Sequence, residues 1–210
     1  MIEEPIHATW GDWLVSEIEQ DDPEGVAIWY LGCNGFVVRS ATTVLYIDPY
    51  FGDGNPPGLV RMIPVPIDPA AVTECDAVLI THEHIDHMHP PSYGPLLRDD
   101  GRLYAPSASY ESLDYGGDLR VDEERRTVVG AAETFSVGDF DVHVRGAHDP
   151  DAIEPVSFVI EHEAGTFFHG GDSKPASAFA EIGAAFDLDM GALAFGTAGS
   201  RVGTDHPDGF

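Results

Sequence analysis

Basic residues are scarce in this sequence of 210 residues, which has 10 lysines and arginines against 37 aspartates and glutamates. The formal charge of −27 offers no counter-charge to the phosphates of nucleic acid or to an anionic membrane surface, so we expect neither as a partner. Such a charge repels itself in dilute buffer but is screened over about 3 Å at 1 M salt. We therefore expect a halophilic protein, adapted to a salt-rich cytosol.

Cysteine and long apolar runs are also scarce. Two cysteines, Cys33 and Cys75, are too few for a disulfide framework in a chain of this length, and we expect both to be buried thiols that bind no metal. No apolar run approaches the roughly 20 residues that span a bilayer, and the N-terminus lacks the basic segment of a signal peptide. A cytoplasmic location is the resulting expectation.

Apolar residues nevertheless make up 43% of the chain, enough for a substantial core, and we expect one domain over residues 1–210. Runs of β-type residues predict strands, a meander and a hairpin, at 26–31, 36–39, 44–47, 77–80, 103–105, 127–148, 156–169 and 190–195. Helical spacing predicts helices at 9–19, 90–97, 107–113 and 175–186. This order suits an α/β fold of two sheets packed face to face with helices outside.

Two further segments have competing interpretations. Trp10 and Trp13 give the first helix an aromatic face, which we expect to pack against the domain. Residues 52–69 are rich in glycine and proline and predict a long loop that walls a pocket. Arg61 in this loop is either a contact for an anion or a solvated side chain.

The most informative segment is Thr81–His87, which follows the apolar strand 77–80. His82 and His84 alternate with Glu83, so an extended backbone would direct both imidazoles at one ion, and Asp86 and His87 are near enough to hold a second. A solvated histidine-rich loop is the alternative, but the order of strand, His-x-His and Asp-His favours a metal site.

A carboxylate also ends the strand 44–47. Asp48 is suited to a hydrogen bond with a metal-bound histidine, and it is equally suited to a plain turn before Pro49.

The His-x-His-x-Asp-His segment, the later His148 and Asp172 in Gly-Gly-Asp-Ser resemble the metallo-β-lactamase superfamily. Four stretches are similar to its L-ascorbate-6-phosphate lactonase group: 10–20 (WGDWLVSEIEQ), 29–33 (WYLGC), 76–79 (DAVL) and 168–173 (FHGGDS). The resemblance runs from about residue 9 to the end. It implies an αβ/βα sandwich of two mixed sheets with metals at one edge.

The resemblance also implies a set of ligands for one or two divalent ions, Zn, Mn or Fe. His82, His84 and His148 would hold one ion, and Asp86 and His87 the other, with Asp172 bridging. His143 competes with His148 but lies within an alternating strand, which favours a structural role. The resemblance gives His169 and Ser173 supporting roles and turns Glu83 away from the metals.

The implied activity is hydrolysis by a metal-activated water of a lactone or ester, such as an anionic sugar-phosphate lactone, with Asp86 as the catalytic proton carrier. The alternatives are a phosphodiesterase and a non-catalytic metal-binding remnant. The family supplies a further histidine downstream of where this chain stops, and His206 has no strand to place it. We therefore expect a C-terminally incomplete domain or an incomplete second metal position. A sheet edge left open in this way would favour a homo-oligomer.

Overall fold

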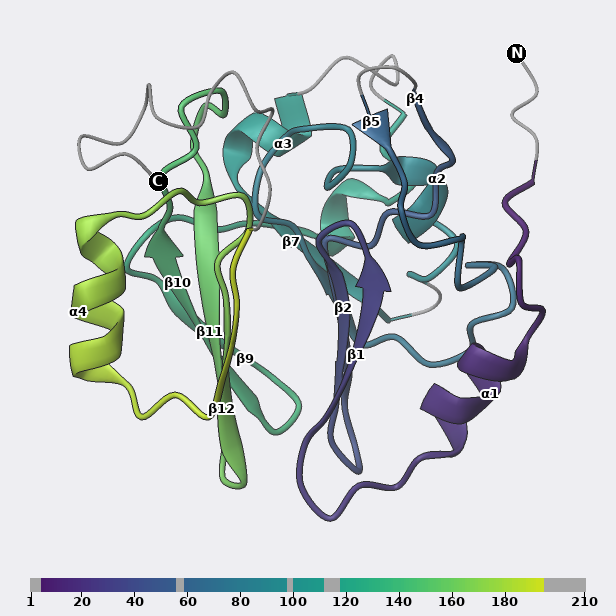
Figure 1. The fold of residues 1–210 in the computed structure, drawn as a ribbon, viewed down its shortest axis with the longest axis horizontal. Helices are drawn as coiled ribbons and strands as arrows, with labels where there is room; N and C mark the ends of the chain where they lie inside the picture. Colours follow the sequence, from purple (N-terminus) through teal and green to yellow (C-terminus); the bar gives the residue numbers. More distant parts are fainter. Residues whose placement is uncertain (1–4, 56–58, 98–99, 112–117, 195–210) are drawn as a thin grey trace.

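The computed structural model describes residues 5–55, 59–97, 100–111 and 118–194, which form two β-sheets packed face to face (Figure 1). The larger sheet has the strand order β1-β2-β3-β6-β7-β8, and the smaller has β13-β12-β11-β10-β9. Each sheet mixes parallel and antiparallel pairs, as β2 with β3 and β3 with β6 illustrate. The predicted sandwich of two mixed sheets with outer helices is confirmed.

The strands of the larger sheet are β1 (Ala27–Gly32), β2 (Gly35–Arg39), β3 (Val44–Ile47), β6 (Ala77–Leu79), β7 (Arg102–Ala105) and β8 (Arg126–Val128). Those of the smaller sheet are β9 (Thr134–Val137), β10 (Phe140–Gly146), β11 (Val156–His162), β12 (Gly165–His169) and β13 (Met190–Ala192). A separate pair consists of β4 (Gly54–Asn55) and β5 (Leu59–Val60). The helices are α1 (Trp13–Gln20), α2 (Pro90–Tyr93), α3 (Ser107–Glu111), the 3₁₀ turn η1 (Glu123–Arg125) and α4 (Ser177–Ala185). None of the described helices is long and apolar enough to cross a bilayer.

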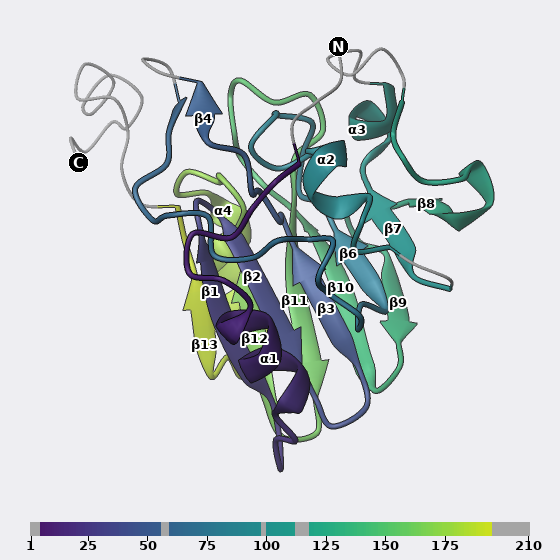
Figure 2. The ribbon, with the colours of Figure 1, turned by 90° about the vertical axis from the view of Figure 1, so that its right-hand side faces the viewer.

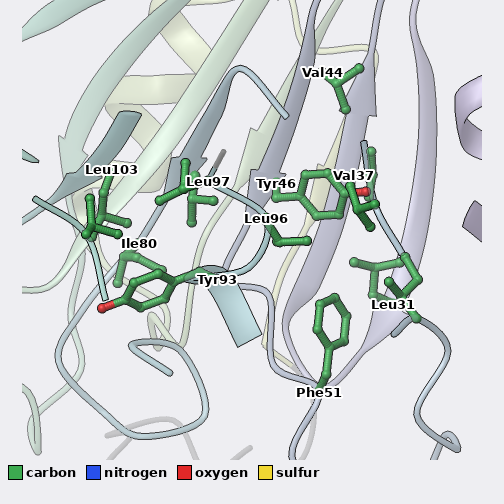
Figure 3. Close-up of a cluster of buried hydrophobic side chains, with 14 of the residues drawn as sticks. Leu31, Val37, Val44, Tyr46, Phe51, Ile80, Tyr93, Leu96, Leu97 and Leu103 are labelled. Atoms are coloured by element: carbon green, nitrogen blue, oxygen red, sulfur yellow. The ribbon is translucent and has the colours of Figure 1, made fainter. Parts of the chain in front are cut away.

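Three apolar layers hold this arrangement together. Alternate residues of facing strands fill the space between the sheets, among them Phe36, Leu45, Leu79, Val142, Phe158 and Ile160. The other face of the larger sheet packs against α1, α2 and the neighbouring loops, with Tyr46, Phe51, Tyr93, Leu97 and Leu103 in the cluster (Figure 3). On the far side, Ile182 of α4 packs on Val159 and Phe168. Each fully buried large apolar side chain contributes about 1.5–3 kcal/mol to the stability of the fold. The packed layers therefore fix the positions of the strand ends.

The strand directions gather polar residues at one edge. β3, β6 and β7 run parallel, so their carboxyl ends meet at the same end of the sheet (Figure 2). Asp48 directly follows β3, and the Thr81–His87 segment lies between β6 and α2. The fold therefore delivers these two segments to one place.

The structure corrects three local expectations. The segment 127–148 is not one meander, because β8 pairs in parallel with β7 in the larger sheet while β9 and β10 belong to the smaller. The first helix buries Leu14, Val15 and Ile18, whereas Trp10 and Trp13 are 45% and 53% exposed and do not form its packing face. Both cysteines are free and only half-buried. Residues 112–113 of the third predicted helix and His206 lie outside the described residues.

Candidate metal centre

Imidazole and carboxylate side chains meet where the chain leaves β6, β10 and β12. They form two overlapping groups, within each of which the ligand atoms all lie within 4.8 Å of one another. The first group is His82, His84 and Asp149, and the second is His82, His87 and Asp172. Because His82 belongs to both, the described residues provide two adjacent positions for a cation.

A turn after β6 brings these imidazoles together. The backbone amides of His87 and Met88 donate to the carbonyl of His84, at 3.0 and 2.8 Å. The turn carries His87 back against His82, with ring centroids 3.9 Å apart. The alignment of the histidines thus comes from a hydrogen-bonded turn and not from an extended backbone.

Hydrogen bonds to Thr81 fix the proton of His82. The Thr81 hydroxyl donates its one hydrogen to Asp48 Oδ2 at 2.7 Å, so its oxygen accepts from His82 Nδ1, 3.0 Å away. Burial, with the adjacent His87, lowers the pKa of His82 to about 3. The ring is therefore neutral at physiological pH, and His82 Nε2 carries a bare lone pair.

His84 presents a second ring nitrogen to the same point. Its Nε2 lies 3.2 Å from the carbonyl oxygen of Asp151, which places the proton of a neutral His84 ring there. His84 Nδ1 lies 2.9 Å from His82 Nε2, and Asp149 Oδ2 lies 3.5 and 3.7 Å from these two atoms. Two imidazole nitrogens and a carboxylate oxygen that converge on one point form a donor set that fits a divalent metal such as Zn, Mn or Fe.

The second group contains a buried nitrogen without a hydrogen bond. His87 Nδ1 donates to Asp48 Oδ2 at 2.8 Å, whereas His87 Nε2 is buried and has no hydrogen-bond partner among the described residues. Asp172 Oδ1 lies 3.5 Å and Asp86 Oδ2 3.9 Å from that nitrogen. A buried polar atom left unpaired costs about 1–3 kcal/mol, and a cation coordinated by His87 Nε2 would remove this cost.

Asp48 supports both groups from beneath. Its side chain is fully buried, its backbone has a φ of 44°, and it also accepts a hydrogen bond from the Thr81 amide at 2.8 Å. Burial alone raises the pKa of Asp48, but the facing His87 outweighs burial and lowers it. Burial alone would lower the pKa of His87, and the carboxylates of Asp48 and Asp172 raise it well above its usual value. Asp48 thus has the hydrogen-bonding role rather than that of a plain turn residue.

Asp172 reaches the site through a tight turn after β12. Gly171 has a φ of 56°, and a Cβ there would lie 3.0 Å from Thr81, so glycine permits this approach. Asn34 Nδ2 donates to Asp172 Oδ1 at 2.8 Å. Burial alone raises the pKa of Asp172, but the adjacent His87 outweighs burial and lowers it to about 2.

The structure brings together five of the six predicted ligands. His82, His84, His87 and Asp172 lie in the two groups, with Asp86 beside them. The exposed His148 side chain lies in neither group; its amide donates to Ser173 Oγ at 2.9 Å and its carbonyl accepts from the Lys174 amide at 2.8 Å. Its neighbour Asp149 occupies that place, and the role of His148 as a ligand stays a prediction.

Glu83, His143 and Ser173 each have contacts that indicate their roles. Glu83 accepts the Ile153 amide at 2.8 Å and so ties the loop after β10 to the site. His143 Nε2 lies against the Glu161 carboxylate, and His143 Nδ1 forms a hydrogen bond with the Thr134 hydroxyl, in keeping with a structural role. Ser173 holds the backbone of the loop that carries Asp149.

Arg61 is neither solvated nor free to bind an anion through both of its terminal nitrogens. Its half-buried guanidinium donates to the carbonyls of Tyr50 and Leu31, each at 2.5 Å, and thereby ties the loop to β1.

Two residues of the site were not predicted from the sequence. Asp149 follows His148 directly, and the family pattern implies a lone histidine at this place and not a carboxylate. Asn34 carries a turn signal with Gly35, which concealed its contact with Asp172. The available signal for Asp149 was a carboxylate two residues before Asp151. No signal in the sequence indicated the contact of Asn34.

A family model described as a β-lactamase superfamily domain matches residues 43–193, which include Asp48 and all of the ligand candidates. The chain belongs to the metallo-β-lactamase superfamily. The match spans strands of both sheets as well as the site, so the family accounts for the sandwich and for the edge at which the ligands meet.

Curated relatives include "Probable L-ascorbate-6-phosphate lactonase UlaG" of Escherichia coli strain SMS-3-5, with 28% identity over 235 residues, 89% of this chain and 65% of the relative. The protein of the same name from Escherichia fergusonii has the same values. The chain thus spans about two thirds, 65%, of the length of these relatives.

Solved structures share the fold. Igni18, a metallo hydrolase from Ignicoccus hospitalis, superposes with a TM-score of 0.60 at 18% identity, covering 80% of this chain and 69% of that one. YhfI, a metallo-β-lactamase fold protein from Bacillus subtilis, gives 0.56 at 17% identity, with 80% and 70% covered. CmlA, a diiron β-hydroxylase from Streptomyces venezuelae, gives 0.59 at 23% identity, with 81% and 34% covered.

Proposed function

We propose that this protein is a metal-dependent hydrolase that opens a lactone or ester. The observation that carries the proposal is the convergence of His82 Nε2 and His84 Nδ1, 2.9 Å apart, beside His87 Nε2, which has no hydrogen-bond partner among the described residues. His82, His84 and Asp149 would hold one divalent ion, and His87 and Asp172 a second. Ions held there supply a nucleophilic water at neutral pH and polarise the carbonyl oxygen under attack.

The chain's own residues have distinct tasks in such a reaction. Thr81 and Asp48 hold the Nδ1 atoms of His82 and His87, and so direct the Nε2 atoms of both rings toward the site. Asp86 lies outside both groups of three, 3.9 Å from His87 Nε2, and its carboxylate is partly exposed. We assign it the proton that passes to the leaving ring oxygen.

The lactone assignment rests on the relatives named as lactonases, which this chain covers only in part. An anionic substrate such as a sugar-phosphate lactone meets a chain of charge −27, so local cations must supply the attraction. Phosphodiester hydrolysis is the alternative reaction for the same donor set, and a non-catalytic metal-binding remnant is the alternative class.

The test is a metal-reconstitution assay. Protein stripped with a chelator is reloaded with Zn²⁺, Mn²⁺ or Fe²⁺ and assayed against a lactone, an ester and a phosphodiester. We expect metal-dependent lactone or ester hydrolysis that falls more than about 100-fold in His84→Ala, because a ligand is lost. His143→Gln, outside the site, is the matched control and should retain activity.

Each other outcome changes the assignment. Turnover of the phosphodiester alone would replace the lactonase by a phosphodiesterase. Stoichiometric metal binding with no turnover of any substrate would leave the non-catalytic protein.

A further inference from the structure

The turn between β1 and β2 connects the two sheets at the metal centre. Asn34 in this turn donates its amide to Asp172 Oδ1 at 2.8 Å, and its backbone carbonyl accepts a hydrogen bond from His169 Nε2 at 2.9 Å. The turn belongs to the larger sheet, whereas His169 and Asp172 end and follow β12 of the smaller. One residue therefore holds a candidate ligand across the interface between the sheets.

In the contact between His169 and Asn34, His169 is the donor and the Asn34 carbonyl is the acceptor. The Gly171 amide lies 3.3 Å from His169 Nδ1 and donates to it, so the proton of the imidazole is on Nε2 and points at the Asn34 carbonyl. His169 is fully buried, and burial lowers its pKa, which keeps the ring neutral. The backbone of Asn34 is thus anchored independently of its side chain.

The Asn34 side-chain amide donates to the Asp172 oxygen that faces the second group. Asp172 Oδ1, which accepts from Asn34, is also the oxygen 3.5 Å from the unpaired His87 Nε2. One lone pair of Oδ1 accepts the amide hydrogen, and another remains directed toward His87. In the first group, Asp149 Oδ1 accepts from the Asp151 amide of its own loop, at 3.3 Å, and the described part of the chain offers it no equivalent donor from the larger sheet.

We propose that Asn34 is a positioning residue for the second metal position: its amide orients the Asp172 carboxylate so that Oδ1 and His87 Nε2 bind the same ion. This assignment rests on the proposed function, because it requires a cation in the group of His82, His87 and Asp172. It predicts an effect on one of the two positions only.

A purely structural role for the turn can be separated from positioning. Tyr30 Oη donates to the Cys33 carbonyl at 2.8 Å, so Tyr30→Phe removes one hydrogen bond from the same turn and leaves Asp172 untouched. Asn34→Ala removes the amide donor. Asn34→Leu removes the donor and keeps a side chain of similar size.

The experiment is a titration of the metal-free full chain with Zn²⁺ against a chromophoric chelator. The absorption spectrum of the Co²⁺-loaded protein provides a second readout. We expect the wild-type protein to bind two ions. In both Asn34 variants the first ion should bind with unchanged affinity and the second about 10–100-fold more weakly, as for other groups that orient a ligand. The Co²⁺ bands of the second ion should change, and Tyr30→Phe should match the wild type.

The contrary results are distinguishable. Asn34 variants that bind both ions like the wild type, or a Tyr30→Phe variant that loses the second ion equally, would overturn this assignment and leave the proposed function standing. A wild-type chain that binds one ion but no second would also overturn this assignment, and a chain that binds no ion at all would contradict the proposed function as well.

Discussion

An aspartate with hydroxyl neighbours lies at each end of strand β3. The two clusters differ in whether polar atoms around the aspartate are left without a hydrogen bond. At the carboxyl end, Asp48 accepts from Thr81 and His87. At the amino end, Asp139 of the β9–β10 turn accepts from Ser40 and Thr42, at 2.8 and 3.0 Å. Both clusters pin one segment of the fold to another.

The difference lies in the neighbours of the carboxylates. The hydroxyls of Ser40 and Thr42 use their hydrogens in binding Asp139. His162 Nε2 lies 3.4 Å from the same carboxylate, but the other nitrogen of that ring accepts from the Ala164 amide at 3.1 Å. Asp48 accepts from Thr81 and from His87, and His87 Nε2 points away from Asp48 with no hydrogen-bond partner among the described residues. A carboxylate cluster is therefore a candidate metal site where a residue that donates to it has a further nitrogen without a hydrogen-bond partner. Where every such atom is hydrogen-bonded, the cluster has a structural role.

The largest effect is expected for Asp48→Asn. Asp48 is fully buried and paired with His87, and removal of one member of a buried pair costs about 3–5 kcal/mol. Urea unfolding of the metal-free protein measures this loss. The control Asp141→Asn removes one exposed charge from β10, and a loss for Asp48→Asn no larger than that of the control would show that the pair does not stabilise the fold.

A smaller effect is expected for Thr81→Val, which keeps the shape of the buried side chain and removes only its hydroxyl. Asp48 keeps its bonds to the Thr81 amide and to His87, so the free energy of unfolding should fall by about 1–3 kcal/mol. His82 loses the acceptor that fixes its proton, so metal affinity should fall about tenfold. Unchanged metal affinity in a calorimetric titration would contradict the role given to Thr81.

The smallest effect is expected for Asp139→Asn at the other end of β3. Partial burial raises the pKa of Asp139, but its hydrogen bonds with Thr43, Ser40 and Thr42 outweigh burial and lower the pKa to about 2. Because the folded pKa lies below the unfolded value of about 3.8, this stabilisation is complete above pH 3.8 and is lost as the pH falls through 2.

The melting temperatures of wild type and Asp139→Asn should therefore differ at pH 5 and converge toward pH 2. Metal affinity should be the same in both. The carboxylate is partly exposed, so the difference should be under about 1 kcal/mol. A difference that stays constant between pH 5 and pH 2 would contradict the cause given for the lowered pKa.

Sequence patterns predicted the strands well where they are buried on both faces. Val44–Ile47 was predicted with the observed bounds, because its apolar run is bounded by polar residues and by Asp48-Pro49. The same patterns did not assign a strand to a sheet, and β8 was placed in a meander although it pairs with β7. Periodicity reports which face of a strand is buried but not which strand lies beside it.

The site was predictable to the extent that its residues share one segment. His82, His84 and His87 come from six consecutive positions, and the family resemblance added Asp172. The places of Asp149 and Asn34 depend on how segments of the smaller and larger sheets meet, which is set by backbone hydrogen bonds such as the one from the Val156 amide to the Thr81 carbonyl. No local pattern records such contacts.

The most direct test of the metal centre is anomalous diffraction from crystals of the chain soaked in Zn²⁺ and measured on both sides of the zinc absorption edge. The account predicts two peaks, one among His82, His84 and Asp149 and one beside His87 Nε2 and Asp172. A map with no anomalous density at His84 and His87, from protein whose histidines are placed as described here, would contradict it.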